Sequence, residues 1–253
     1  MLKAVEKDNK AFADFCDRDV FGTRIKTYYN CYSTDYDFVK FWAQYDENGR
    51  ITAAVSRVDG DATLCAEHAD TDELKEFFNL VGYRTIQCSE SVAACLSGEY
   101  QWGYVVECGK AGEYKEIEIK KDFEPKEIYD IIKPENLTGV GDYLPWLSDT
   151  VYRLNRNAAS GAVAQLDGKN AGCAMVLFRT DRAALLGAVA TKPEFRGRGV
   201  ARSLVLGLAQ KELENGRRVE LLCKCGTIVE FYKSIGFEVT GKWGLIQNAA
   251  EIL

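Results

Sequence analysis

Three arginines and two glycines alternate over a short stretch in the last third of the chain, and this arrangement suits the binding of an anion. The residues are Arg196, Gly197, Arg198, Gly199 and Arg202. Cations at a helix N-terminus are unfavourable by roughly 0.3–1 kcal/mol each, so three of them call for a counter-charge. Glycines let backbone N–H groups approach that charge without a Cβ atom in the way. Solvated arginines on a surface helix are the alternative, but the interleaved pattern favours a bound polyanion.

The residues on either side of this stretch predict the elements that would hold it. The apolar run Leu185–Ala190 indicates a buried strand. Beyond Gly197, apolar residues recur with a helical period. They are Val200, Ala201, Leu204, Val205, Leu208 and Ala209. The order is therefore strand, glycine loop and helix, a layout that directs free N–H groups at an anion.

The motif excludes two common phosphate-binding loops and resembles a third. No Walker A pattern is present here, and a Rossmann pattern would need glycine at position 202, where the chain has Arg202. The residues read Arg196-x-x-Gly199-x-Ala201. This pattern resembles the acetyl-CoA signature of the GNAT acetyltransferase superfamily, Arg/Gln-x-x-Gly-x-Gly/Ala. The downstream segment Glu230–Glu238, EFYKSIGFE, is similar to the helix-to-strand segment of the same family. The resemblance extends from about residue 115 to residue 253.

The resemblance implies acetyl-CoA as cosubstrate, without a metal, bound by the strand, the loop and the helix start. Loop N–H groups would bind the pyrophosphate and an arginine the remaining phosphate. The pantetheine arm would pair with the exposed edge of the strand, where the N–H of Val189 or Ala190 would stabilise the oxyanion. The residues expected to contact the cofactor are Val189, Ala190, Thr191, Arg196, Gly197, Arg198, Gly199, Val200, Ala201 and Arg202.

The reaction implied is the direct attack of a primary amine on the thioester. Tyr232 occupies the position of the family's acid, which protonates the leaving thiolate; a core aromatic is the alternative. Cys225 stands where the family often has an asparagine that contacts the CoA arm. The general base stays open, with Glu220 as a candidate beside a structural role.

The chain predicts an internal duplication and an α/β fold with a mixed sheet. Its 253 residues suit two domains, and the order strand, helices, three antiparallel strands, helix, strand occurs twice. We therefore expect two tandem GNAT-like domains, 1–112 and 113–253, each a mostly antiparallel sheet flanked by helices. In the first copy, carboxylates at Asp70, Asp72 and Glu73 replace the glycine loop and would repel phosphate. This copy is thus expected to be degenerate, with the nearby His68 either functional or a surface or capping residue.

Composition restricts the partners. A net charge of −6 argues against nucleic-acid binding. The longest apolar run, Ala183–Ala190, is far shorter than the ~18 residues of a membrane span. The chain has nine cysteines and no apolar leader, which suggests the cytoplasm, and we expect these cysteines in the core rather than around zinc.

The acceptor is expected to be the amine of a small molecule or peptide, and the protein a monomer or homodimer. The segment Asp142–Asn157 falls where the family's early helices wall the acceptor site. Its Tyr143, Trp146 and Tyr152 suit a pocket or plain core packing equally. The predicted function is N-acetyl transfer; the alternatives are a non-catalytic CoA-binding or sensing protein, and an interaction module.

Overall fold

The computed structural model describes residues 1–120, 122–135, 140–224 and 226–248, which form two compact units. Unit 1 comprises Met1–Val105, Leu222–Val229 and the described residues from Val239, and unit 2 comprises Val106–Leu221 and Glu230–Glu238. The border divides four elements between the units: β6 (Gln101–Cys108), β11 (Arg218–Cys223), α8 (Thr227–Ser234) and β12 (Phe237–Gln247). The predicted boundary between two domains after residue 112 stays a prediction, and so does the assignment of cofactor binding to the second domain.

Unit 1 has a sheet with the strand order β1-β2-β3-β4-β5-β12. Its neighbouring strands pair antiparallel except for β4 and β5, which are parallel. Its other elements are β1 (Leu2–Ala4), α1 (Lys10–Phe15), α2 (Val20–Tyr32), β2 (Val39–Tyr45), β3 (Ile51–Val58), β4 (Asp61–Ala66), α3 (Thr71–Val81), β5 (Thr85–Ser89) and α4 (Glu90–Leu96).

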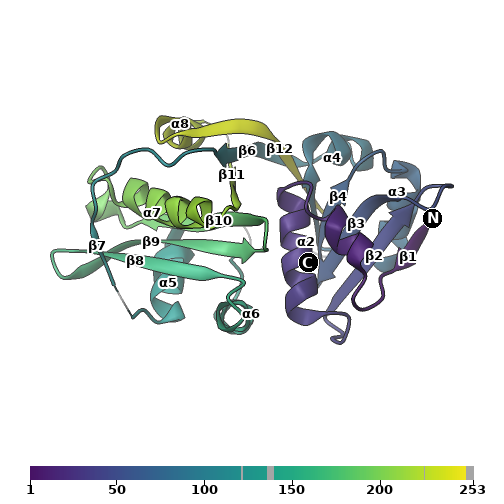
Figure 1. The fold of residues 1–253 in the computed structure, drawn as a ribbon, viewed down its shortest axis with the longest axis horizontal. Helices are drawn as coiled ribbons and strands as arrows, with labels where there is room; N and C mark the ends of the chain where they lie inside the picture. Colours follow the sequence, from purple (N-terminus) through teal and green to yellow (C-terminus); the bar gives the residue numbers. More distant parts are fainter. Residues whose placement is uncertain (121, 136–139, 225, 249–253) are drawn as a thin grey trace. The chain divides into compact units, whose positions relative to one another are not determined.

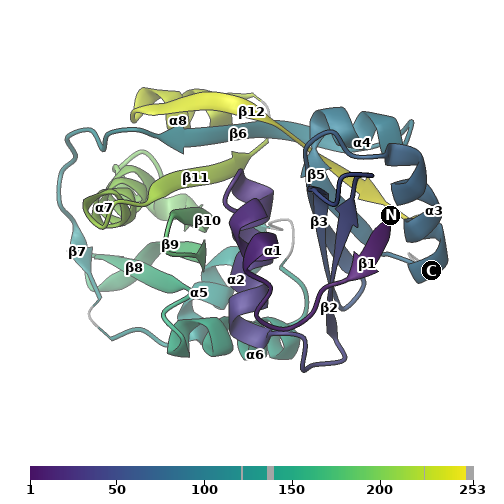
Figure 2. The same ribbon diagram turned by 45° about the vertical axis from the view of Figure 1, so that its right-hand side comes forward.

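Helices cover both faces of the unit 1 sheet, as two successive residues of β2 demonstrate. The ring of Phe41 lies 6.2 Å from that of Phe12 on α1, whereas the ring of Trp42 lies 5.1 Å from that of Phe77 on α3. Successive residues of a strand point to opposite faces, so α1 and α3 lie on opposite sides. Figure 2 shows α1 and α2 on one side of these strands and α3 and α4 on the other.

Unit 2 repeats this arrangement with the strand order β11-β10-β9-β8-β7. Its neighbouring strands pair antiparallel except for β10 and β11, which are parallel. Its elements, apart from those that the border divides, are β7 (Glu118–Ile119), α5 (Pro125–Ile132), η1 (Lys133–Glu135), α6 (Tyr143–Asn155), β8 (Ser160–Leu166), β9 (Lys169–Arg179), β10 (Ala183–Thr191), η2 (Pro193–Phe195) and α7 (Val200–Glu214).

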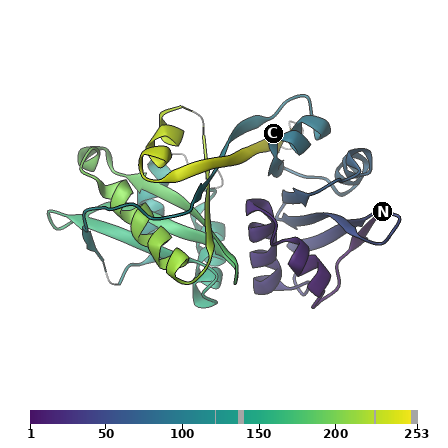
Figure 3. The same ribbon diagram turned by 45° about the horizontal axis from the view of Figure 1, so that its top comes forward.

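Helices α7 and α5 cover opposite faces of strands β8–β10 (Figure 1). A Cβ atom on Gly172 of β9 would lie 2.8 Å from Val200 at the start of α7. The next residue, Cys173, belongs to the apolar cluster that contains Ile128 of α5. Successive side chains therefore meet different helices, as strand geometry requires. Figure 3 shows α7, in green, crossing in front of these strands.

The structure confirms the α/β fold class with its mostly antiparallel sheet, and the two units have the same order of elements and the same pairing. Two local predictions were wrong. The helix α4 was not expected. The alternating Ile117 and Ile119 predict a strand over Tyr114–Lys120, but the strand is reduced to Glu118–Ile119. The residues before this short strand run along α7 instead, because Ser203 Oγ donates to Lys115 O at 2.5 Å and Arg202 Nη2 donates to Glu113 O at 2.8 Å.

Candidate anion and acyl-transfer site

The end of β10 carries a bulge and separates from β11. The parallel pairing of β10 with β11 ends with Leu186 opposite Leu221, and the antiparallel register of β10 against β9 shifts between Gly187 and Ala190. Within this irregular stretch Ala188 has a φ of 49°. A bulge bends a strand and redirects its polar groups. Residues Val189–Thr191, which are expected to contact the pantetheine arm, thus lie beyond the part of β10 that pairs with β11. An extended ligand can pair with the strand there.

The helix α7 begins at the predicted glycine loop without a side-chain cap. Gly199 is the N-cap residue with φ 82°, and Gly197 has φ 75°, values that glycine adopts at no steric cost. The first helical hydrogen bond runs from Ser203 N to Gly199 O at 3.0 Å. The N–H groups of Val200, Ala201 and Arg202 come before it and have no acceptor within the helix. This helix start therefore offers donors and a partial positive charge to an anion.

The equivalent helix of unit 1 has its N-terminus occupied by its own carboxylates. The Asp70 side chain accepts hydrogen bonds from the N–H groups of Asp72 and Glu73, both at 3.1 Å. Both donors are acidic residues in the first turn. His68, just upstream, is exposed with φ 56°. The helix start in unit 1 is thus satisfied internally and negative, whereas that of α7 is uncapped and surrounded by arginines.

Each of the three arginines has a partner in the protein. Arg196 donates from Nε to Thr191 O at 3.1 Å and from Nη2 to Glu135 at 2.6 Å. Arg198 Nη1 lies 3.0 Å from Asp167 on the β8–β9 turn. Arg202 holds the carbonyl of Glu113, as described above. Nothing in the sequence points to Glu135 or Asp167 at this site, because ion pairs between distant elements leave no pattern in a single sequence.

Tyr232 lies on α8 in unit 2, and the structure places its ring in an aromatic cluster. It is 5 % exposed, and its ring lies 5.1 Å from that of Phe231 and 5.6 Å from that of Phe237. Tyr232 thus makes the contacts of a core aromatic, the alternative that the sequence offered. Its role as the acid stays a prediction. Glu220, the candidate base, is buried beside the Arg218 guanidinium at 3.2 Å. Cys225 lies outside the described residues.

The aromatic side chains expected near the acceptor pack against α5 and within α6. The ring of Tyr129, on α5, lies 4.9 Å from that of Tyr143 and 5.2 Å from that of Trp146. Trp146 also packs against the apolar cluster under β10. Tyr152 instead stacks with Arg156, whose guanidinium carbon lies 3.4 Å from the ring centroid. Tyr129, whose ring joins α5 to α6, was not among the residues expected near the acceptor.

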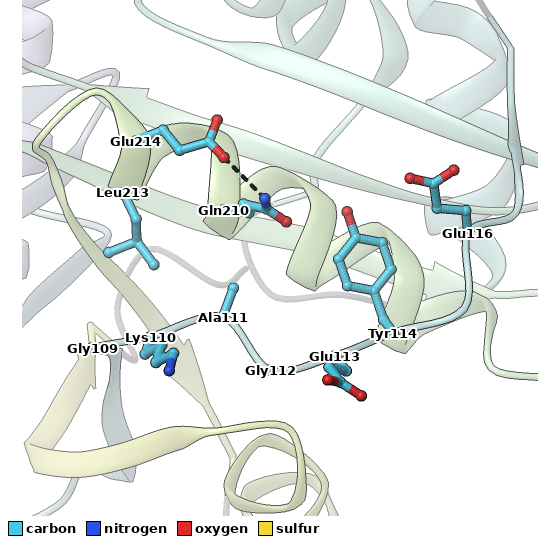
Figure 4. Close-up of a pocket in the computed structure, with 10 residues that line it drawn as sticks. All are labelled: Gly109, Lys110, Ala111, Gly112, Glu113, Tyr114, Glu116, Gln210, Leu213 and Glu214. Carbon is cyan, nitrogen blue, oxygen red and sulfur yellow. Dashed lines mark hydrogen bonds between the residues drawn. The ribbon is translucent and has the colours of Figure 1, made fainter.

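An open cleft of about 730 Å³ lies at the other end of α7 (Figure 4). It is bounded by the segment 109–116 on one side and by Gln210, Leu213 and Glu214 of α7 on the other. None of the predicted cofactor-binding residues lines it. The α7 residues that line the cleft lie in the last two turns of the helix, whereas the glycine loop lies at its start; Glu113 on the other wall accepts a hydrogen bond from Arg202.

The remaining observations concern metals, membranes and thiols. In the part of the chain that the structure describes, no three metal-binding side chains come together, and no helix has the length and hydropathy to span a membrane. Of the eight cysteines within the described ranges, seven are buried and Cys95 is exposed. Burial raises the pKa of the Cys173 thiol to about 12, so this thiol is protonated at neutral pH.

Unit 2 thus combines a bulged strand, a glycine loop and an uncapped helix start. Residues 157–239 match the acetyltransferase (GNAT) domain family. This range holds β10, the loop and α7.

Solved structures share the fold over almost the whole chain. A GCN5-related N-acetyltransferase from Sphaerobacter thermophilus is 17 % identical, with a TM-score of 0.60 over 97 % of this chain and 94 % of its own. A tandem GNAT protein from the clavulanic acid biosynthesis pathway is 12 % identical, with a TM-score of 0.59 over 98 % of both chains. A GNAT-family acetyltransferase from Colwellia psychrerythraea is 13 % identical, with a TM-score of 0.58 over 98 % and 99 %. No curated protein matches the sequence.

Proposed function

We propose that the protein is an N-acetyltransferase that moves the acetyl group of acetyl-CoA to a primary amine of a small molecule or peptide. One observation carries the proposal: the N-terminus of α7 has Gly199 as an uncapped N-cap, whereas α3 of unit 1 is capped by Asp70. A helix start with free N–H groups favours a polyanion, and one filled by carboxylates repels it. Cofactor binding is accordingly assigned to unit 2 alone.

The transfer itself needs an oxyanion donor and an acid. The N–H of Val189 or Ala190, at the bulged end of β10, is the proposed donor to the developing oxyanion. As the amine nitrogen bonds to the acetyl carbon and the C–S bond breaks, Tyr232 is proposed to protonate the leaving CoA thiolate, and the proton that the nitrogen loses passes to the solvent or to a general base, for which Glu220 is the candidate. The amine would attack from the side of β10 that α5 and α6 cover.

Calorimetric titration with acetyl-CoA tests the proposal, with ADP as the control ligand. We expect micromolar affinity for acetyl-CoA, about −8 kcal/mol, and much weaker binding of ADP. Removing a charge-assisted contact to phosphate weakens binding, so the variants Arg198→Gln and Arg202→Gln should each lose affinity. Absence of binding at millimolar acetyl-CoA would contradict the assignment.

A second candidate, a CoA-binding protein without turnover, is favoured by the burial of Tyr232 among Phe231 and Phe237. Thiol release in the presence of a panel of primary amines separates the two functions. Release that depends on an amine supports transfer; tight binding without release under any amine supports the second candidate.

A further inference from the structure

Glu135 and Arg196 join three segments of unit 2 at the proposed cofactor site. The Arg196 guanidinium donates to Glu135, the last residue of η1, and to the Thr191 carbonyl at the end of β10. Arg196 is itself the first residue of the glycine loop, residues 196–199, which we call the anion loop. A single guanidinium thus connects η1, β10 and the loop. Because the group is planar, its N–H donors point in fixed directions.

The η1 turn in turn continues α5, which packs on the proposed site from the opposite face to α7. Ile128, Ile131 and Ile132 of α5 are buried in one cluster with Ala190 of β10. The Tyr129 hydroxyl and the Lys133 ammonium both donate to Gly141 O, just before α6, at 3.1 and 3.3 Å. A displacement of Glu135 would therefore shift α5 and the hydrogen bonds that α5 and Lys133 make to Gly141, before α6.

We infer that Glu135 is a positioning residue, which holds Arg196 as a brace between the anion loop and the helices α5 and α6 that face the acceptor. The inference rests on the proposed function and deepens it. It assigns Arg196 to bracing, and leaves phosphate contacts to the loop N–H groups, Arg198 and Arg202. Binding of CoA at the loop and the state of the α5 end are coupled through this ion pair.

The alternative to a brace is that Arg196 binds a phosphate of CoA directly. If Arg196 were a phosphate ligand and Glu135 its competitor, removing the carboxylate would free the guanidinium and strengthen CoA binding, while removing the guanidinium would weaken it. A brace gives the same sign for both changes, since either one releases the loop. The sign of the Glu135 effect thus separates the two roles.

The comparison uses the full chain and calorimetric titration with CoA. We expect Glu135→Gln and Arg196→Gln each to weaken CoA binding by about 5-fold, and the double variant to bind no worse than either single variant, because residues that act together are not additive. Asp167→Asn is the matched control, since it removes the carboxylate that pairs with Arg198, the next arginine of the loop, from the β8–β9 turn; it should leave the affinity within 2-fold or raise it. An unchanged or tighter affinity for Glu135→Gln overturns the inference.

Hydrogen–deuterium exchange supplies a readout that a merely structural contact would not move. We expect saturating CoA to slow exchange in the peptide that covers Ile128–Glu135 of the wild type, and not in Glu135→Gln at its own saturating concentration. Protection that persists in the variant, or is absent from the wild type, contradicts the coupling. Wild-type protein that binds no CoA at all contradicts the proposed function as well, whereas normal wild-type binding with an unaffected Glu135→Gln variant contradicts the brace alone.

Discussion

The Arg179 guanidinium and the Glu212 carboxylate form a buried ion pair in unit 2, with 2.5 Å between Nη2 and Oε1 and side chains that are 6 % and 2 % exposed. Arg179 also donates to Asn157 and Ser160, and Arg217 approaches the same carboxylate to 3.0 Å. The pair fixes the last turns of α7 to β9. The start of α7, where the anion site is proposed, is thus anchored from its far end.

Loss of this carboxylate should destabilise unit 2. Removing one partner of a buried pair leaves an uncompensated charge and typically costs about 3–5 kcal/mol. We expect Glu212→Ala to lower the unfolding free energy by this amount in urea titrations. Glu214→Ala, two residues further along the same helix at an exposed position, is the control and should change stability by less than about 0.5 kcal/mol. Equal stability of the two variants would show that the pair contributes nothing.

Glu127, in the first turn of α5, should make stability depend on acidic pH. Hydrogen bonds from Lys120, then Asn170, then the Glu124 N–H lower the pKa of its carboxyl to about 2. A carboxyl whose pKa is lower in the folded than in the unfolded state stabilises the fold above the unfolded pKa of 4.5. This contribution is lost as the pH falls from 4.5 towards 2.

The measurement compares wild type and Glu127→Gln by urea unfolding at several pH values. Hydrogen bonds to a charged group contribute about 1.5–3 kcal/mol, so the variant should be less stable by about 2 kcal/mol at pH 7. The difference should shrink between pH 4.5 and pH 2. Glu118→Gln, at an exposed position of β7, is the control and should change stability at pH 7 by less than about 0.5 kcal/mol. A gap that stays constant with pH would rule out titration of Glu127 as its source.

Sequence reasoning succeeded where a local pattern decides the structure. An Asp-Gly pair between two strands predicts a hairpin turn, and Asp167 and Gly168 have the positive φ values, 54° and 71°, that such a turn needs. The spacing of apolar residues predicts a helix over roughly Tyr143–Asn155, and α6 has these bounds. Helix α4 was missed because it has only seven residues, in which Val92, Ala93 and Leu96 pack on the core, too short a run to establish a helical period. The strand expected near Tyr114 failed because hydrogen bonds from α7 to the segment around Lys115 outweigh its alternating pattern.

At the candidate site, the sequence predicted the elements but not the partners of their side chains. Glycines 197 and 199 stand where the backbone needs positive φ, and this need is local. The pairing of Arg196 with Glu135 joins residues 61 positions apart, and only the packing of α5 on β10 brings them together. Electrostatic partners of this kind depend on tertiary structure, which a single sequence does not encode in a readable pattern.

Gly103 on β6 tests how closely three strand segments of unit 1 approach. A Cβ atom there would lie 2.3 Å from Cys223 O and 2.6 Å from the Trp243 ring, which itself donates to Cys223 O at 2.9 Å. Forcing a methyl group into such a site typically costs about 1–3 kcal/mol. We expect Gly103→Ala to lower the melting temperature clearly. The control is Gly98→Ala, where a Cβ atom would meet nothing within 4 Å; equal melting temperatures would contradict the close approach.

Tyr232→Phe removes the proposed acid and keeps the ring that packs against Phe237. Because the ring contacts stay, the fold and the affinity for acetyl-CoA should change little. General acid catalysis typically contributes 10²–10⁴-fold, so kcat should fall by about 100-fold with an amine substrate found in the panel. Tyr83→Phe is the control, because this tyrosine packs on Phe78 of α3 in unit 1; the variant should keep the wild-type kcat. If Tyr232→Phe turns over as fast as the wild type, the thiolate takes its proton from another group and Tyr232 is a core aromatic.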